Sequence, residues 1–241
     1  MPPVEHHDSI TKLPESHAKT VSSILKLIEN NIPVYISCPT MKQNKSDFRE
    51  VLEWANNHKI SANTDYSIMA EYDHCADNLC HRLSPKECGE VISDIVEFDQ
   101  DYQREILQVG FVKRIKEFQV NPDSRFCGVG ISTCCMSSTG LVFPCPSWQS
   151  YICGNLNENS LIDIWENSQK LNHLRGIKRK DIPKCIDCEN AAFCSPCFAR
   201  NANESLDGNM LEVNEYFCDV AAMNKEIVFN YIKNHKKQDN M

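Results

Sequence analysis

The cysteines are the residues of this chain whose type and spacing could do chemistry. The sequence holds 14 of them among 241 residues, and ten lie between residues 127 and 218. The string CIDCENAAFCSPC leaves two, five and two residues between consecutive cysteines, which are Cys185, Cys188, Cys194 and Cys197. Two cysteines separated by two residues can turn both sulfurs toward one centre, and thiolates bind zinc and iron–sulfur clusters. This run therefore predicts a metal centre.

The other cysteines of this region are spread more widely. Cys127 is followed by twelve residues and then by Gly140, and four residues separate that glycine from Cys145. The glycine permits a tight hairpin that would bring the second thiolate back toward the first. Eight cysteines fit two four-thiolate sites, and spacing alone does not choose between zinc and iron. Because four-cysteine zinc sites usually contain two close pairs, the distant Cys127 and Cys145 favour larger clusters.

Composition and charge argue against several classes of protein. A hydrophobic content of 41% with 24% charged residues is typical of a folded globular chain. The net charge of -8 argues against nucleic acid as a partner, and no run approaches the roughly 18 apolar residues of a membrane span. The N-terminal string MPPVEHHDSITK lacks the basic and apolar segments of a secretory signal, so we expect a cytoplasmic protein with reduced cysteines. His6 and His7 are expected in a flexible polar terminus.

Residues 1–120 are expected to alternate helices and strands. Apolar spacing predicts helices at 16–30, with Ser16 as N-cap, at 46–58 and at 84–98, strands at 34–37 and 64–69, and a polar loop at 70–82. The strand–helix–strand order implies a right-handed crossover and a parallel sheet, which predicts an α/β fold. Two parallel strands need neighbours in the sheet, so this half looks incomplete at its front.

A second, smaller domain is expected at residues 121–241. The cysteine content rises after the turn-forming cluster Asn121–Ser124. Within this domain we predict a hairpin from residues 133–136 and 141–143, short helices at 160–167 and 169–176, and a terminal helix at 219–236. Four aromatic residues flank cysteines and are expected to shield a metal centre or to pack in the core: Phe126, Phe143, Trp148 and Phe193.

The cysteine register resembles the C-terminal SPASM domain of radical S-adenosylmethionine (SAM) peptide maturases. That pattern is Cys, nine to fifteen residues, Gly-x4-Cys, a gap, Cys-x2-Cys-x5-Cys-x3-Cys, a gap and a final Cys. This chain departs from it only in having two residues between Cys194 and Cys197. The phrases CGVGISTCCMSSTGLVFPCP and CGNLNENSLIDIWENS also look like family sequence. Three earlier segments resemble parts of the radical SAM barrel. The segment after the fourth strand resembles EHHDSITKLPESHAKT, the fifth strand and its loop resemble IPVYISCPTMKQN, and the sixth strand and its exit loop resemble DYSIMAEYDHCADNLCHRLS.

The resemblance implies two auxiliary 4Fe–4S clusters and their ligands. By position, the first cluster would be held by Cys127, Cys145 and Cys197, with Cys134 as the fourth ligand. Cys135 and Cys153 stay open as alternatives for that fourth position. The second cluster would be held by Cys185, Cys188, Cys194 and Cys218. The expected fold is thus the later part of a partial (β/α) barrel at residues 1–120, followed by a SPASM domain with a hairpin, short helices and a terminal helix.

The resemblance also implies an oxidoreductase that uses SAM to modify a ribosomally made peptide or protein. Relatives cleave SAM on a cluster held by Cys-x3-Cys-x2-Cys, and no such run exists here. We therefore expect the C-terminal portion of a maturase, unable to cleave SAM alone, with SAM bound only when a companion chain supplies the missing barrel half. Ser37 and Met69 would then lie at the rim of the SAM pocket. Four other polar residues on loops at this rim are expected to cap turns or face solvent: Asn44, Asp73, His74 and Asp77.

Two other classes of protein fit the same residues. A binding module would capture a peptide or a companion subunit and use the clusters as structural staples. A zinc-stapled structural protein would hold zinc through the same thiolates. Metal analysis of protein kept free of oxygen discriminates between iron and zinc.

Overall fold

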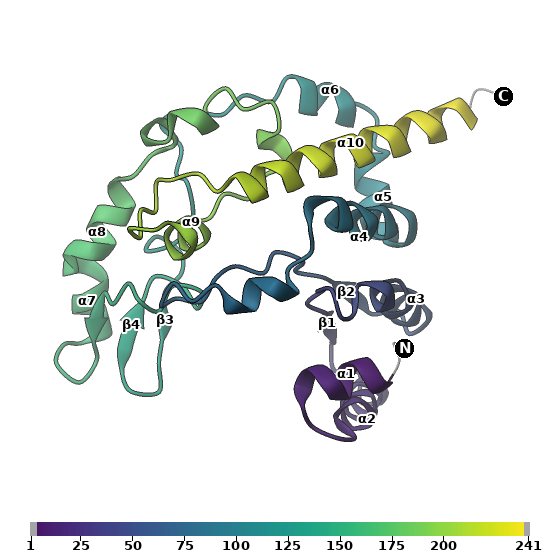
Figure 1. Cartoon of the computed structure of the whole chain (residues 1–241), viewed down its shortest axis with the longest axis horizontal. Coiled ribbons are helices and arrows are strands. Elements are labelled where there is room, and N and C mark those ends of the chain that lie inside the picture. Colours follow the sequence, from purple (N-terminus) through teal and green to yellow (C-terminus); the bar gives the residue numbers. More distant parts are fainter. Residues whose placement is uncertain (1–3, 239–241) are drawn as a thin grey trace. The chain divides into compact units, whose positions relative to one another are not determined.

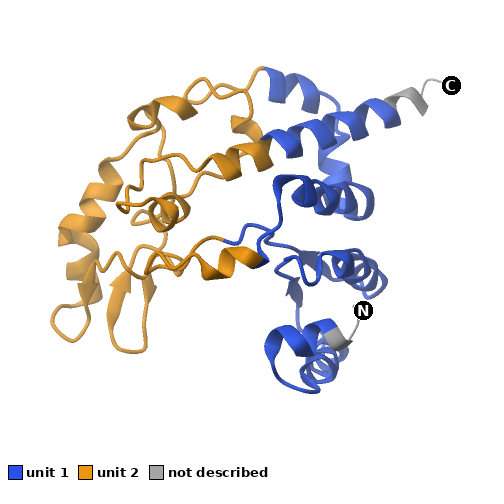
Figure 2. Cartoon of the chain, in the orientation of Figure 1, with its two compact units in different colours: residues 1–68, 81–116, 222–241 blue, residues 69–80, 117–221 orange. Residues whose placement is uncertain are grey.

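The computed structural model describes residues 4–238 of the chain (Figure 1). Its contacts divide the chain into two compact units, shown in blue and orange in Figure 2. The first unit contains residues 1–68, 81–116 and 222–241, and the second contains residues 69–80 and 117–221. This division differs from the domains 1–120 and 121–241, which stay a prediction. No described helix has the length and apolar character needed to cross a membrane.

The first unit contains a parallel pair of strands, as the strand–helix–strand pattern predicts. The strands β1 (Tyr35–Ser37) and β2 (Ser61–Asn63) pair in register, with Tyr35 opposite Ser61, and α3 (Phe48–Asn57) connects them. The helix follows a single 3-10 turn, η1 (Lys45–Asp47). Its apolar residues at helical spacing are all buried, which confirms the predicted core face: Phe48, Val51, Leu52 and Ala55. This face covers the sheet from one side of the crossover.

The strand predicted at 64–69 is wrong, because β2 ends at Asn63. The backbone N–H groups of Cys38 and Thr40 donate to the carbonyls of Asn63 and Asp65 at 2.9 and 3.3 Å, so hydrogen bonds between the two segments persist as far as Asp65. Beyond that point the carboxylate of Asp65 accepts the N–H of Ser67 at 2.8 Å. This local turn competes with strand pairing and ends the extended run.

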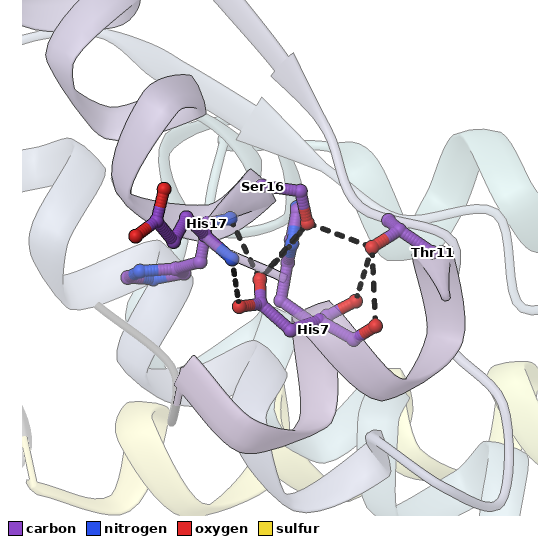
Figure 3. A network of polar contacts seen from close by, with 6 residues as sticks. His7, Thr11, Ser16 and His17 are labelled. Atoms are coloured by element: carbon purple, nitrogen blue, oxygen red, sulfur yellow. Dashed lines mark hydrogen bonds and ion pairs between the residues drawn. The ribbon is translucent and has the colours of Figure 1, made fainter. Parts of the chain in front are cut away.

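The N-terminal segment is helical, so the expected flexible terminus around His6 and His7 is wrong. Here α1 (Val4–Thr11) precedes α2 (Ser16–Glu29), and Nδ1 of His6 lies 2.7 Å from the carboxylate of Asp47. Ser16 is not the N-cap, because the cap position belongs to Glu15 at φ +63°. Instead, Asp8 accepts the N–H groups of Glu15 at 2.7 Å and His17 at 2.8 Å (Figure 3). A carboxylate supplied by the preceding helix therefore satisfies the free donors at the start of α2.

The next helix, α4 (Pro85–Phe98), forms where the sequence predicts one. Ser84 caps it in a reciprocal arrangement, since its hydroxyl accepts the N–H of Glu87 and the carboxylate of Glu87 accepts the N–H of Ser84 at 2.9 Å. Its buried residues recur at helical spacing and include Cys88, Val91 and Ile92. Two short helices follow in the same unit, α5 (Gln100–Ile106) and α6 (Phe111–Lys116).

The second unit contains the predicted hairpin, and Gly140 takes φ +88° at its turn. The strands of its antiparallel sheet lie in the order β3 (Cys135–Met136), β4 (Leu141–Phe143) and β5 (Gly154–Asn155). The third strand has two residues, too few for a sequence pattern to indicate it. The helices α7 (Leu161–Asn167) and α8 (Gln169–Gly176) match the predicted ranges, and the hydroxyls of Ser160 and Ser168 cap them.

Short turns and two helices complete the cysteine-rich part of the chain. These elements are η2 (Asp77–His81), η3 (Arg179–Asp181), η4 (Pro183–Cys185), η5 (Ala191–Phe193), α9 (Phe198–Glu204) and α10 (Glu215–Gln238). The terminal helix begins at Glu215 rather than at Asp219, because the side chain of Asn214 accepts the N–H of Tyr216 at 3.1 Å and so caps an earlier start.

Two apolar clusters form the core of the second unit. One surrounds Phe126, Trp148 and Phe198, and the other contains Val142, Cys153, Ile164 and Leu171. The rings of Phe126 and Phe198 stack with centroids 4.6 Å apart. Aromatic stacking and the burial of large side chains stabilise these clusters, which hold the cysteine-bearing loops in place.

Candidate metal centres

The four cysteines predicted for the second cluster line one cavity. Cys185 ends η4, Cys194 follows η5 and Cys218 lies in the first turn of α10. Together with Cys188 they line a cavity of about 230 Å³ in the second unit. Short turns shape this run, because the N–H of Cys185 donates to the carbonyl of Ile182 at 2.9 Å. The structure thus brings these four thiols to one space, and their role as ligands stays a prediction.

Burial raises the pKa of three of these thiols, those of Cys185, Cys194 and Cys218. Burial is the main cause that raises the pKa of Cys194, and the neighbouring sulfurs of Cys185 and Cys188 raise it further. Burial also raises the pKa of Cys218 to about 11, with the carboxylate of Glu215 acting in the same direction. A metal that binds here must displace protons and supply positive charge.

Two half-buried arginines line the same cavity, and each has one buried donor without a partner. Arg179 and Arg200 line the cavity, and the Nε atom of each is buried without a hydrogen-bond partner. Their guanidinium groups lie over aromatic rings, Arg179 at 5.3 Å from the centroid of Phe126 and Arg200 at 4.6 Å from that of Phe217. Both arginines act to lower the pKa of Cys194. Four thiols with two such cations fit an anionic iron–sulfur cluster, because its charge would satisfy the buried donors.

The three cysteines predicted to anchor the first cluster also lie together. Cys127 follows the buried Phe126, Cys145 follows β4, and Cys197 is the N-cap of α9. All three pack against the apolar cluster around Phe126 and Phe198. Burial raises the pKa of Cys145, and the sulfurs of Cys197 and Cys127 contribute to this rise, which indicates that the three thiols are electrostatic neighbours. Cys197 also lines the cavity of the second group, so the two groups of thiols adjoin.

Cys134, the predicted fourth ligand, lies in a different environment. It packs against the apolar cluster of Val142, Ile164 and Leu171, which also contains Cys153. The thiol of Cys153 donates to the carbonyl of Tyr151 at 3.4 Å, and burial raises its pKa to about 11. The structure therefore places Cys134 and Cys153 together, in the core cluster next to α7 and α8.

The thiols do not form a site for a single metal ion. Among residues 4–238, no group of three or more His, Cys, Asp or Glu side chains is arranged to hold one ion. Four sulfurs bound to one zinc at about 2.3 Å must converge closely. In a cluster, each cysteine binds a different iron atom, so the sulfurs lie further apart.

Ser37, predicted at the rim of a SAM pocket, lines a cavity of about 250 Å³ in the first unit. His7, His17 and Cys38 line the same cavity. Figure 3 shows the polar network beside it, in which Nδ1 of His7 lies 3.0 Å from the hydroxyl of Ser16. Burial lowers the pKa of His17, and its Nε2 atom is buried without a hydrogen-bond partner. Ile10, Ile24 and Ile36 also line this cavity, so most of its wall is apolar, and a role for Ser37 stays a prediction.

Met69, the other predicted rim residue, belongs to the second unit and packs against the cluster around Phe126. Two of the four polar loop residues, Asn44 and Asp73, serve turns, as expected. The side chain of Asn44 accepts the N–H of Met41 at 2.8 Å, and that of Asp73 accepts the N–H of Cys75 at 3.0 Å. Nδ1 of His74 lies 3.2 Å from the carbonyl of Asn203.

Sequence reasoning missed Arg179, Arg200 and His17. Nothing in their local sequence separates these residues from ordinary surface cations or helix residues. Only the folded chain shows that their donors are buried without a partner beside a cavity.

Similarity to known proteins bears on these sites. Residues 127–189 match the SPASM family model, an iron–sulfur cluster-binding domain. Over 228 residues the chain is 22% identical to an AdoMet-dependent heme synthase of Methanosarcina barkeri, covering 88% of this chain and 63% of the relative. An AdoMet-dependent heme synthase of Oleidesulfovibrio alaskensis is 24% identical over 220 residues, covering 83% of this chain and 55% of the relative. The chain thus spans less than two thirds of either relative.

Solved structures share the fold. Native anSMEcpe with bound AdoMet and the Cp18Cys peptide aligns with a TM-score of 0.65 at 15% identity, over 98% of this chain and 68% of that one. Native anSMEcpe with bound AdoMet aligns with a TM-score of 0.61 at 17% identity, over 97% and 65%. The expected α/β fold, part of a radical SAM barrel with a SPASM domain, is therefore confirmed. Taken together, the domain match at residues 127–189, the relatives and the shared fold support a radical SAM/SPASM protein.

Proposed function

We propose that this chain holds two 4Fe–4S clusters. One would be held by Cys185, Cys188, Cys194 and Cys218, and the other by Cys127, Cys145, Cys197 and a fourth cysteine. The observation that carries the proposal is the cavity in which four thiols meet two buried arginine Nε atoms without partners. When bound, such clusters supply one-electron transfer. Phe126 and Phe217 line the cavity and would exclude water from the sulfurs, which tunes the reduction potential.

We further propose that the chain is part of an enzyme that modifies a peptide or protein by radical chemistry. The fold it shares with anSMEcpe, one structure of which holds a bound peptide, supports this substrate class. In this function the residues of the second unit would bind two redox centres, exclude water from them and balance the negative charge of the clusters. Cys197 borders both groups of thiols and would hold the centres close enough for electrons to pass between them.

The same proposal holds that these 241 residues do not cleave SAM by themselves. They contain no Cys-x3-Cys-x2-Cys run, and Cys75, Cys80 and Cys88 have different spacing. SAM would bind only with a companion chain or further residues that carry the missing motif. Contacts of SAM with Ser37 of the first unit and with Met69 of the second unit are separate parts of this proposal. The measurement is 5′-deoxyadenosine formed from SAM under reducing, oxygen-free conditions. None is expected from this chain, and formation of the nucleoside would contradict this part of the proposal.

Metal analysis tests the cluster assignment directly. The chain, purified without oxygen, is expected to contain about eight iron atoms and about eight sulfides, four of each for every cluster. Cys188→Ser should remove about half of both, because serine does not replace a thiolate of the second site. Cys80→Ser is the matched control, since Cys80 is exposed and lies outside both groups, and it should keep the full content. Stoichiometric zinc with no iron would overturn the proposal.

A second candidate function is a role in heme synthesis. Both curated relatives are AdoMet-dependent heme synthases, and they match 83–88% of this chain. A heme-type substrate is flat and absorbs visible light, whereas a peptide does neither. Difference spectroscopy with hemin therefore separates the candidates. Saturable binding of one hemin per chain would favour heme synthesis, and unchanged spectra would favour the peptide.

A further inference from the structure

We propose that Cys135, and not its neighbour Cys134, is the fourth ligand of the first cluster. This inference rests on the proposed function, because it assumes that Cys127, Cys145 and Cys197 hold an iron–sulfur cluster. Two features of the second unit support it: the register of the hairpin and the packing of Cys134.

The register of the hairpin sets which face each cysteine occupies. Cys135 lies directly opposite Phe143 in the β3–β4 pair, and Met136 lies opposite Val142. Directly paired side chains share a face of the sheet, and successive side chains along a strand alternate between faces. Cys134 therefore lies on the opposite face from Cys135, the face that carries Val142.

The packing of Cys134 agrees with that register. Its side chain contacts the apolar cluster that contains Val142, Cys153 and Leu171. This cluster belongs to the side of the sheet covered by α7 and α8, since Ile164 and Leu171 come from those helices. A ligand for the first cluster must instead face Cys127 and Cys145, which pack against the other apolar cluster, around Phe126. The side chain of Cys134 is therefore part of the apolar core around Val142.

The packing of the other cysteines separates in the same way. Cys127, Cys145 and Cys197 pack against the apolar cluster around Phe126. Cys153 belongs instead to the cluster that Cys134 contacts. Cys134 and Cys153 therefore form a separate pair in the core next to α7 and α8, which leaves Cys135 on the other face of the hairpin.

The loop between Cys127 and β3 holds this arrangement in place. The N–H of Gly130 donates to the carbonyl of Thr133 at 3.0 Å, and the guanidinium of Arg175 donates to the carbonyl of Gly130 at 2.6 Å. Val129 is buried in the cluster around Phe126. Because a shift of one residue along β3 would exchange the two cysteines, these contacts fix which thiol faces the site.

Two single substitutions at adjacent positions test the inference. Cys135→Ala should remove the first cluster, so that iron falls from about eight to about four atoms per chain, or should leave an open iron whose electron paramagnetic resonance signal changes on addition of cyanide. Cys134→Ala should keep the full iron content and the wild-type signal in the presence of cyanide. The signal of the second cluster serves in both variants as the internal control for folding.

Each pattern of results decides the question. Loss of iron or a change of the signal with cyanide in Cys135→Ala, but not in Cys134→Ala, supports the inference. The inference would be overturned if Cys134→Ala lost iron, if both variants lost the same amount of iron, or if Cys135→Ala kept the wild-type iron content and signal. In that case Cys153→Ala tests the remaining candidate. A wild-type chain with two intact clusters confines any such failure to this inference. A wild-type chain without iron overturns the proposed function itself.

Discussion

Replacing Gly140 with alanine should strain the hairpin that carries Cys145 toward the first site. Gly140 takes φ +88°, and a Cβ there would lie 2.9 Å from the side-chain nitrogen of Asn157. The backbone conformation costs about 1–2 kcal/mol for a residue with a Cβ. That nitrogen donates to the carbonyl of Thr139 at 2.9 Å and to the side chain of Asn155 at 3.0 Å, and displacing it costs about 1 kcal/mol more.

The free energy of unfolding should therefore fall by about 2–3 kcal/mol. For a chain of this size the midpoint of thermal unfolding should drop by roughly 4–12 °C. Circular dichroism of oxygen-free protein measures it. Gly110→Ala is the matched control, because Gly110 also has φ +88° but no atom within 4 Å of the added Cβ, so only the backbone cost applies. Gly176→Ala should have little effect, since that position has neither constraint. Equal losses at Gly140 and Gly110 would refute the steric part of this reasoning.

Three further outcomes are expected from other parts of the chain. Arg200→Gln should lower the reduction potential of the second cluster by tens of millivolts in a redox titration. A cation beside the sulfurs stabilises the reduced form, and about 1 kcal/mol corresponds to roughly 40 mV for one electron. Arg104→Gln, a surface variant in the other unit, should leave this potential unchanged. Burial raises the pKa of the Cys38 thiol from 9.0 to about 11, so the unfolded chain loses this proton at a lower pH than the folded chain. The free energy of unfolding should therefore fall as pH rises from about 9 to 11. This fall should be smaller in Cys38→Ser, and rapid alkylation of Cys38 at pH 8 would contradict the assignment. Ser84→Ala should lower the free energy of unfolding by about 1 kcal/mol through loss of the cap of α4, whereas Ser84→Asp should retain most of it.

Local sequence predicts the elements whose causes are local. The helix α4 begins at Pro85 because Ser84 and Glu87 cap it, and both residues are visible in the sequence. The core face of α3 follows from apolar residues at helical spacing. The turn of the hairpin follows from Gly140. In each case the residues that decide the structure lie within a few positions of it.

Long-range contacts decide what the sequence could not show. The cap of α2 comes from Asp8 on the preceding helix, so Ser16 only looks like a cap. Arg179 and Arg200 acquire a role only because folding buries their Nε atoms beside the thiols.

The two groups of thiols differ in how they are assembled, and this difference explains which ligands the sequence could predict. In the second group, three of the four cysteines lie within ten consecutive residues, so short turns alone bring them together. In the first group, Cys127, Cys145 and Cys197 come from three separate segments, and all three pack against the apolar cluster around Phe126. The fourth position then depends on strand register, which spacing does not encode for two adjacent cysteines. Because Cys197 lines the cavity of the second group as well, folding of the locally built group would help to position the distant one.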